Sequence, residues 1–178
     1  MNAISFAHPQ PARPIMSGAL VRDSLWAGLL GGSAMAAAGV LLAEISGYDG
    51  WFPLKALGSL VLGPGALSAS GFAAAPVIAG LLIQLAVAAL LGLLFTFLTR
   101  QLGRLPTDYG IPALSGLVFG LAVWLGLSLA LPVLLPQLLA STAPAFIAQY
   151  MIYGTLTGLI VAWLHPRVYA ARPAGGKR

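Results

Sequence analysis

The stretch AAPVIAGLLIQLAVAALLGLLFTFL, residues 74–98, decides the fold because it is apolar over its whole length. It contains no charged residue, and Gln84 is its one strongly polar side chain. An α-helix rises ~1.5 Å per residue, so a run of this length reaches across the ~30 Å hydrocarbon core of a bilayer. A helix that is apolar on every face has little use in a small soluble domain. The stretch therefore predicts a membrane span.

The composition of the whole chain agrees with a membrane protein. Of its 178 residues, 59% are hydrophobic and 7% are charged, and the mean hydropathy is +0.93. Soluble domains carry about 25% charged residues, so this chain is predicted to be an all-α polytopic integral membrane protein. It contains no cysteine, which excludes disulfides and thiol chemistry.

Hydropathy divides the chain into four spans. The prediction is a bundle of four transmembrane helices in a membrane domain over residues 23–166, between tails at 1–22 and 167–178. The expected spans are residues 25–45, 76–98, 111–134 and 145–164. Residues 53–62, PLKALGSLVL, lie between the first two spans. This segment is too short to cross the membrane, and it predicts an interfacial or re-entrant helix.

The basic residues predict the orientation. With four spans, both termini lie on one side, and the opposite side receives only Lys55. The side of the termini receives the other eight of the nine Lys and Arg residues: Arg13, Arg22, Arg100, Arg104, Arg167, Arg172, Lys177 and Arg178. Under the positive-inside rule both termini are cytoplasmic, and a chain this short favours a bacterial inner membrane. Because these residues sit at span ends and form no basic face, nucleic-acid binding is not expected.

Small residues at helical spacing predict close helix packing. Spans one, three and four each contain a GxxxG pair, and span two carries a stripe of small and polar residues at every fourth position. Small side chains let helix backbones approach closely in lipid. The predicted packing residues are Gly28, Gly32, Gly80, Gly92, Gly116, Gly120, Gly154 and Gly158. This is more packing surface than a lone bundle requires, so the expected partners are the bilayer and either other membrane subunits or a second copy of the chain.

Few polar residues fall inside the spans. The depth of these residues in their spans predicts that several converge in the periplasmic half of the bundle. They are Glu44, Gln84, Gln149 and either Tyr150 or Tyr153. The two glutamines either hydrogen-bond across helices, which contributes ~1 kcal/mol each, or form the head of a pocket for a quinone, lipid or pigment. Such a pocket would use Gln84, Gln149 and Tyr153, while the identity of any cofactor stays open.

His165 is the remaining candidate ligand, at the end of span four in the sequence WLHP. A neutral imidazole at this place can ligate haem iron or a chlorophyll magnesium. The alternative is an ordinary helix-end residue, favoured by the C-terminal dipole. No set of residues in the sequence predicts a dedicated metal site.

The sequence contains no GxSxG, HExxH, Walker loop or pair of carboxylates, so we expect no enzyme and no catalytic residue. The leading hypothesis is an accessory or assembly subunit of a larger membrane complex, for example an energy-transducing one. A small transporter or channel is the first alternative, although it needs polar residues through the full depth of the bilayer. A cofactor-, quinone- or pigment-binding membrane protein is the second.

Overall fold

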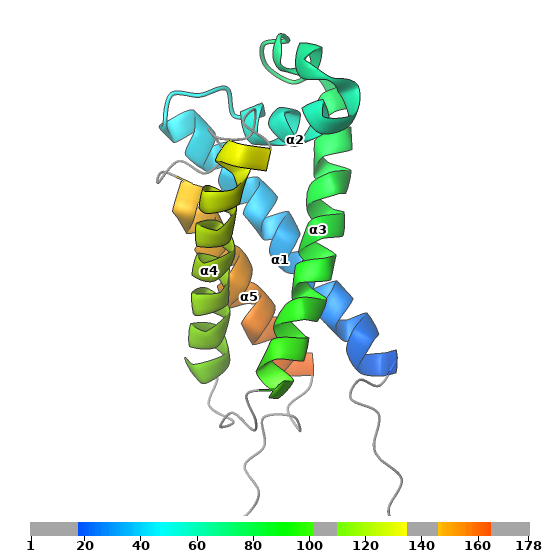
Figure 1. Ribbon diagram of the computed structural model, residues 1–178, viewed down its shortest axis with the longest axis vertical. Coiled ribbons are helices and arrows are strands. Elements are labelled where there is room, and N and C mark those ends of the chain that lie inside the picture. The colour runs from blue at the N-terminus through cyan, green and yellow to red at the C-terminus, as the bar shows by residue number, and fades with distance from the viewer. Residues whose placement is uncertain (1–17, 102–109, 135–145, 165–178) are drawn as a thin grey trace, which may run out of the picture.

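The computed structural model describes residues 18–101, 110–134 and 146–164, and these residues fold into helices. Four long helices and one shorter helix follow each other along the chain, with a single 3-10 turn after the shorter one (Figure 1). They are α1 (Gly18–Ile45), α2 (Phe52–Leu62), η1 (Pro64–Leu67), α3 (Ala74–Gln101), α4 (Gly110–Leu134) and α5 (Ile147–Leu164). The helices α1, α3, α4 and α5 are long and apolar enough to cross a membrane. The predicted all-α architecture of four spans and one shorter helix between the first two is confirmed.

The first helix is longer than the hydropathy pattern indicates. It begins at Gly18, whereas the expected span began at residue 25 and the expected tail ended at residue 22. Arg22 and Asp23 therefore lie inside α1, where they form an ion pair of 2.9 Å. The difference has a simple cause: hydropathy marks where a helix enters the hydrocarbon, but a helix continues into the polar region until a residue such as proline stops it.

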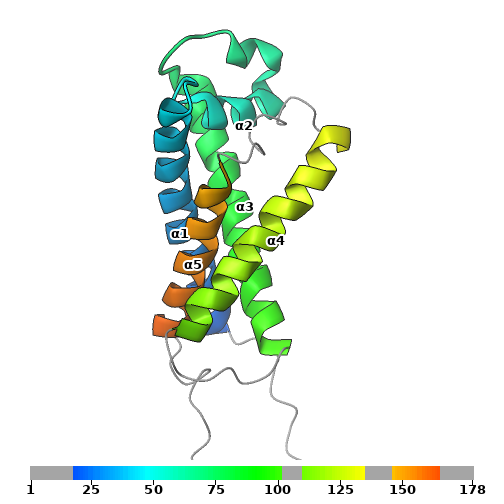
Figure 2. The same cartoon turned by 90° about the vertical axis from the view of Figure 1, so that its left-hand side faces the viewer.

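The four long helices form a bundle, and α2 lies across one end of that bundle (Figures 1 and 2). Helix α1 packs against α3 and α5, α4 packs against α5, and α2 packs against α3. Helices α3 and α4 make few contacts with each other, and Figure 2 shows α4 strongly tilted relative to α3. The bundle is therefore held together by the pairs α1–α3, α1–α5 and α4–α5, whereas α3 has few contacts with α4 and with α5.

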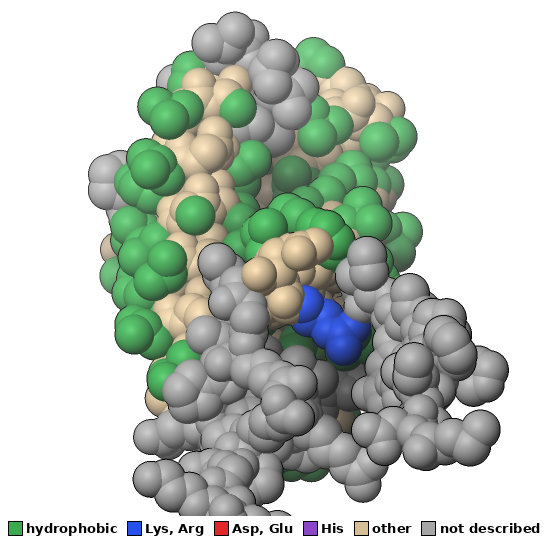
Figure 3. All heavy atoms as spheres, turned by 60° about the horizontal axis from the view of Figure 1, so that its bottom comes forward, with side chains coloured by type: hydrophobic (Ala, Val, Ile, Leu, Met, Phe, Trp, Pro, Cys, Tyr) green, Lys and Arg blue, Asp and Glu red, His purple; other side chains and the backbone are tan. Residues whose placement is uncertain are grey.

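The outer surface of the bundle is apolar. Leu82, Leu90, Leu114 and Leu129 are each more than 60% exposed. Viewed from the end opposite α2, hydrophobic side chains cover the sides of the described bundle and basic side chains lie at that end (Figure 3). An apolar belt of this kind suits contact with lipid acyl chains.

Glycines form the contacts between the helices. A Cβ atom at Gly92 of α3 would lie 2.8 Å from the Gly28 Cα of α1, and a Cβ at Gly32 would lie 2.5 Å from that of Ala88. In the pair α4 and α5, a Cβ at either Gly116 or Gly154 would collide with the carbonyl oxygen of the other.

The remaining packing glycines have the same kind of neighbour. Gly120 lies against the Tyr150 carbonyl, Gly158 against the Pro112 carbonyl, and Gly80 against the backbone of α2 at Leu54. All eight glycines singled out in the sequence therefore face a helix of the same chain.

Helix α2 is fixed over the end of the bundle. Pro53 occupies its first turn, where a missing N–H costs nothing, and Gly63, with φ of 82°, ends it. A Cβ at Gly58 would collide with the Pro76 carbonyl of α3, so the two helices are in backbone contact. The Lys55 side of the helix is buried, whereas Val61 is 72% exposed.

An ion pair holds the two connections of α2 together. The Lys55 ammonium donates to the Asp49 carboxylate and to the backbone carbonyl oxygens of Ala69 at 2.6 Å and Gly71 at 3.2 Å. The same carboxylate accepts the backbone N–H groups of Trp51 at 3.0 Å and Gly71 at 3.1 Å. The hydrogen bond from Lys55 lowers the pKa of Asp49 below its ordinary value of 3.8, against an opposing effect of burial. Lys55, the single basic residue expected on this side, is thus neutralised inside the protein.

Candidate functional site

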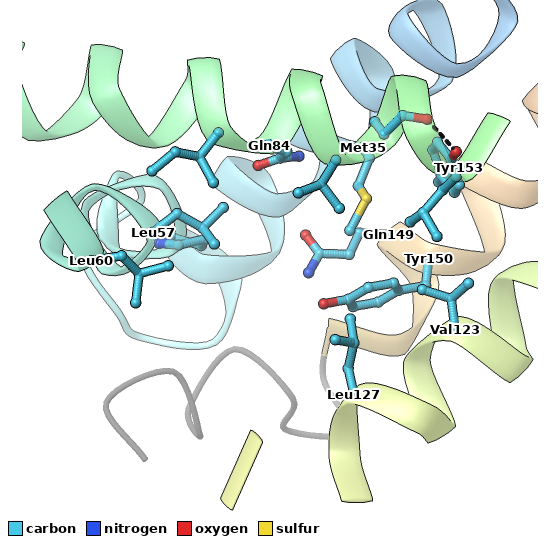
Figure 4. Close-up of a pocket in the computed structure, with 14 residues that line it drawn as sticks. Met35, Leu57, Leu60, Gln84, Val123, Leu127, Gln149, Tyr150 and Tyr153 are labelled. Carbon is cyan, nitrogen blue, oxygen red and sulfur yellow. Dashed lines mark hydrogen bonds between the residues drawn. The ribbon is translucent and has the colours of Figure 1, made fainter. Parts of the chain in front are cut away.

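A pocket of about 240 Å³ lies beneath α2. Its walls come from all five α-helices, and Figure 4 shows the side chains that line it. The apolar walls include Met35 of α1, Leu57 of α2, and Val123 and Leu127 of α4. Two of the lining residues, Leu60 and Val87, are 36% and 48% exposed, so the pocket reaches the molecular surface.

Helix α5 supplies most of the polar wall. Gln149, Tyr150 and Tyr153 fall in its first turns and line the pocket together with Gln84 of α3. All three α5 side chains are buried, with relative exposures of 4%, 7% and 1%. Figure 4 shows the Gln149 amide and the Tyr150 hydroxyl directed into the pocket.

The four polar side chains differ in how they are hydrogen-bonded. The Tyr153 hydroxyl donates to the Ala88 carbonyl oxygen of α3 at 2.7 Å. Gln84 donates a long hydrogen bond of 3.4 Å to the Gly32 carbonyl oxygen of α1. The Gln149 amide and the Tyr150 hydroxyl form no hydrogen bond with any other described residue. These two groups therefore mark the polar end of the pocket.

The Gln149 side chain is held by the helix opposite it. Its carbonyl oxygen lies against Gly39 of α1, where an added Cβ would collide with it. The absence of a side chain at Gly39 therefore makes room for the amide. With its oxygen packed against α1, the side chain presents its N–H groups to the pocket.

The structure brings together three of the four predicted cofactor-binding residues. Gln84, Gln149 and Tyr153 share the pocket, whereas His165 lies outside the described residues. Helix α5 ends at Leu164, at the end of the bundle opposite the pocket (Figure 1). Glu44 does not join the pocket: its carboxylate is at the α2 end and accepts the Gly50 N–H at 3.0 Å.

Sequence reasoning missed most of the pocket wall. Nothing in the local sequence distinguishes Leu57, Val123 or Leu127 from apolar residues that face lipid, because a helix of this kind is apolar on all sides. The glycines at 31, 39 and 58 gave a weak signal, since each leaves space for another helix or side chain. Gly39 and Gln149 lie on different helices, so their contact depends on how α1 and α5 pack and cannot be read from either segment alone.

An apolar cluster fills the bundle between the pocket and the other end. Its buried members are Ala27, Phe95, Val161 and Ala162, with Phe119 and Ile160 packed against them. The rings of Phe95 and Phe119 have centroids 5.3 Å apart. Ser24 donates within its own helix to the Leu20 carbonyl oxygen at 2.7 Å, whereas the buried Thr157 hydroxyl of α5 has no hydrogen-bond partner among the described residues. In the described part of the chain, the buried polar side chains below the pocket are thus single hydroxyls within an apolar interior.

In the described helices, the lining of the pocket is uncharged. Its described lining contains no Asp, Glu, Lys, Arg or His, and no cluster of three or more metal-ligating side chains occurs among the described residues. Amide and phenol groups there can donate and accept hydrogen bonds to a bound molecule, and the aliphatic walls can cover its apolar part.

Comparison with known proteins finds no family model, curated protein or solved structure that matches this chain.

Proposed function

We propose that this integral membrane protein is not an enzyme and that it binds a small lipophilic molecule in the pocket beneath α2. The observation that carries the proposal is a pair of polar groups on α5, the Gln149 amide and the Tyr150 hydroxyl. Both point into a pocket with apolar walls, and neither has a hydrogen-bond partner among the described residues. A ligand that accepts these hydrogen bonds while its apolar part fills the space between the aliphatic walls gains both the polar contacts and the burial of apolar surface.

The packing of the glycines weakens the accessory-subunit hypothesis. That hypothesis assumed that the helices carry more glycine-lined packing surface than one bundle needs. Because all eight glycines face helices of the same chain, they supply no surface for a second protein. A role as a subunit of a larger membrane complex stays a prediction, without support from these residues.

The apolar cluster argues against a transporter or channel. A path for a polar solute needs polar groups or water along the full depth of the bilayer. Here Phe95, Val161 and their neighbours occupy the interior below the pocket. A ligand that stays dissolved in the membrane does not need such a path.

The charges at the two ends support the proposed orientation. Arg22 and Arg100 belong to the helix ends that lie opposite α2 (Figure 1), whereas Lys55 at the α2 end is buried against Asp49. Under the positive-inside rule, the Arg22 end is cytoplasmic and the pocket lies in the periplasmic half of a bacterial inner membrane.

Native mass spectrometry of the full chain tests the proposal. The protein is extracted from its membrane in mild detergent, and we expect one lipophilic molecule bound per chain. Val123→Phe places a ring in the pocket and is expected to abolish this species. The matched control is Val118→Phe on the same helix, where the side chain is 56% exposed on the outer surface.

Two results would contradict the proposal. If no small molecule accompanies the wild-type chain, or if both phenylalanine variants retain it equally, the pocket is not its binding site. Stoichiometric companion proteins without a small molecule would instead favour the accessory-subunit hypothesis.

A further inference from the structure

The pocket contains enough chemistry to define the class of its ligand. We infer that the ligand is an uncharged lipid whose head group offers a carbonyl oxygen to the Gln149 amide and the Tyr150 hydroxyl, with its apolar tail passing out between α3 and α4. This inference rests on the proposed function, because it names the ligand of the same pocket.

The head group is uncharged because the site has nothing to neutralise a charge. Among the described residues, no acidic or basic side chain lines the pocket. The two charged groups nearest in sequence to its α2 wall, Asp49 and Lys55, are paired with each other. Glu44 is exposed at the same end, bonded to the Gly50 N–H. A charged head group moved from water into this site would lose its hydration without gaining a counter-ion, which is strongly unfavourable.

The head group carries an acceptor because the Gln149 amide presents donors to the pocket and the Tyr150 hydroxyl can donate to the same atom. Gln149 packs its oxygen against Gly39 and leaves its N–H groups for the pocket. The Tyr150 hydroxyl also donates, and it comes from the next residue of the same helix turn. Tyr153 is already committed to the Ala88 carbonyl. A carbonyl oxygen has two lone pairs, so a single such atom can accept from both Gln149 and Tyr150.

The tail leaves through the gap between α3 and α4. The volume of about 240 Å³ is below the ~300–1,000 Å³ of sites that enclose a whole drug-sized molecule. The pocket therefore holds a head group and the first part of a chain. Val87 of α3 lines the pocket and is 48% exposed, and α3 makes few contacts with α4 on this side. In the described part of the chain, the pocket thus opens sideways, toward the acyl chains of the bilayer.

A series of probes with one tail and different heads tests the inference. The full chain is reconstituted in phosphatidylcholine nanodiscs, and equilibrium binding is measured for a decyl-substituted benzoquinone, monodecanoylglycerol, decyl phosphate and decane. We expect at least one of the two uncharged carbonyl probes to bind about tenfold tighter than decyl phosphate and decane, the effect of one neutral hydrogen bond or more. Which carbonyl probe binds better distinguishes a quinone from an acylglycerol as the source of the carbonyl.

Two substitutions connect the binding to the named donors. Tyr150→Phe removes one donor, and Gln149→Glu keeps the side-chain shape while replacing the N–H donors by an acceptor. Each is expected to weaken binding of the preferred carbonyl probe about tenfold and to leave decane unchanged. Val118→Phe on the outer surface is the control. Binding is compared only among variants whose unfolding midpoints are close to that of the wild type.

The outcomes separate this inference from the proposed function. If decane or decyl phosphate binds as tightly as the carbonyl probes, or if Tyr150→Phe and Gln149→Glu both leave carbonyl binding unchanged, the head-group assignment is wrong while the pocket still binds a lipophile. If none of the probes binds and no molecule is retained from the native membrane, the proposed function itself fails.

Discussion

The Tyr153 hydroxyl of α5 donates a 2.7 Å hydrogen bond to the Ala88 carbonyl oxygen of α3. This bond spans two helices that otherwise make few contacts, and Tyr153 is 1% exposed. It joins the polar side of α5 to α3 at the wall of the pocket, which both residues line.

Removing this hydroxyl is expected to weaken the bundle. Tyr153→Phe should lower the free energy of unfolding by ~1 kcal/mol, the usual contribution of a hydrogen bond between helices in a membrane protein. Unfolding by a denaturing detergent, followed by circular dichroism, measures the effect. Tyr48→Phe is the control, because this side chain is 43% exposed and lies outside the pocket. An equal loss in both variants would show that the bond to Ala88 is not the cause.

The contact between α4 and α5 should not tolerate a methyl group. Gly116→Ala would place its Cβ against the Gly154 carbonyl oxygen, and at 2.8 Å from the carbonyl carbon. The helices must then separate, which is expected to cost ~1–3 kcal/mol. Gly126→Ala on the same helix has nothing within 4 Å of the new Cβ and should be neutral or slightly stabilising. The comparison of the two unfolding midpoints is the measurement, and equal midpoints would contradict the close packing.

The Asp49–Lys55 pair should behave as a coupled unit. Asp49→Asn leaves the buried Lys55 ammonium without a counter-ion, and we expect a loss of about 2–3 kcal/mol, since the carboxylate is only partly buried. The double variant Asp49→Asn with Lys55→Met removes both charges and should lose less than the sum of the two single changes. A double-mutant cycle of unfolding free energies measures this coupling. Strictly additive losses would mean that the two side chains do not stabilise each other.

The same pair predicts a dependence of stability on acid. Because the pKa of Asp49 is lowered in the folded protein from its ordinary value of 3.8, its carboxylate contributes stability at pH values above that range. The contribution is lost as the pH falls through the folded-state pKa, below 3.8. Unfolding midpoints measured between about pH 5 and pH 2 should therefore fall more steeply for the wild type than for Asp49→Asn. Parallel curves would refute the role of this carboxylate.

The orientation can be tested with single cysteines, because the natural chain contains none. Ser70 lies at the α2 end and Gln101 at the other end, and both are exposed. In intact bacterial cells, a membrane-impermeant maleimide should label the Ser70→Cys variant, and should label Gln101→Cys only after the membrane is permeabilised. The reverse pattern would place the pocket in the cytoplasmic half of the bilayer.

Local sequence determined the elements of this fold. The length of an apolar run decides whether a helix spans a bilayer, and this is a property of consecutive residues, as in residues 74–98. The length of the apolar segment at 53–62 likewise predicts a helix that is too short to cross the membrane. The spacing of glycines also predicted which helix faces are narrow enough for backbone contact, for example at Gly116 and Gly120.

Tertiary structure decided which of these faces meet and what lies between them. That Gly28 meets Gly92, and that Gly39 makes room for Gln149, depends on how helices distant in the chain dock. Uniformly apolar helices carry no local pattern that tells a pocket-facing Val123 from a lipid-facing Val118, because lipid and protein interior are equally apolar. The pocket lies where α3 and α4 make few contacts, while glycine contacts hold α3 to α1 and α4 to α5.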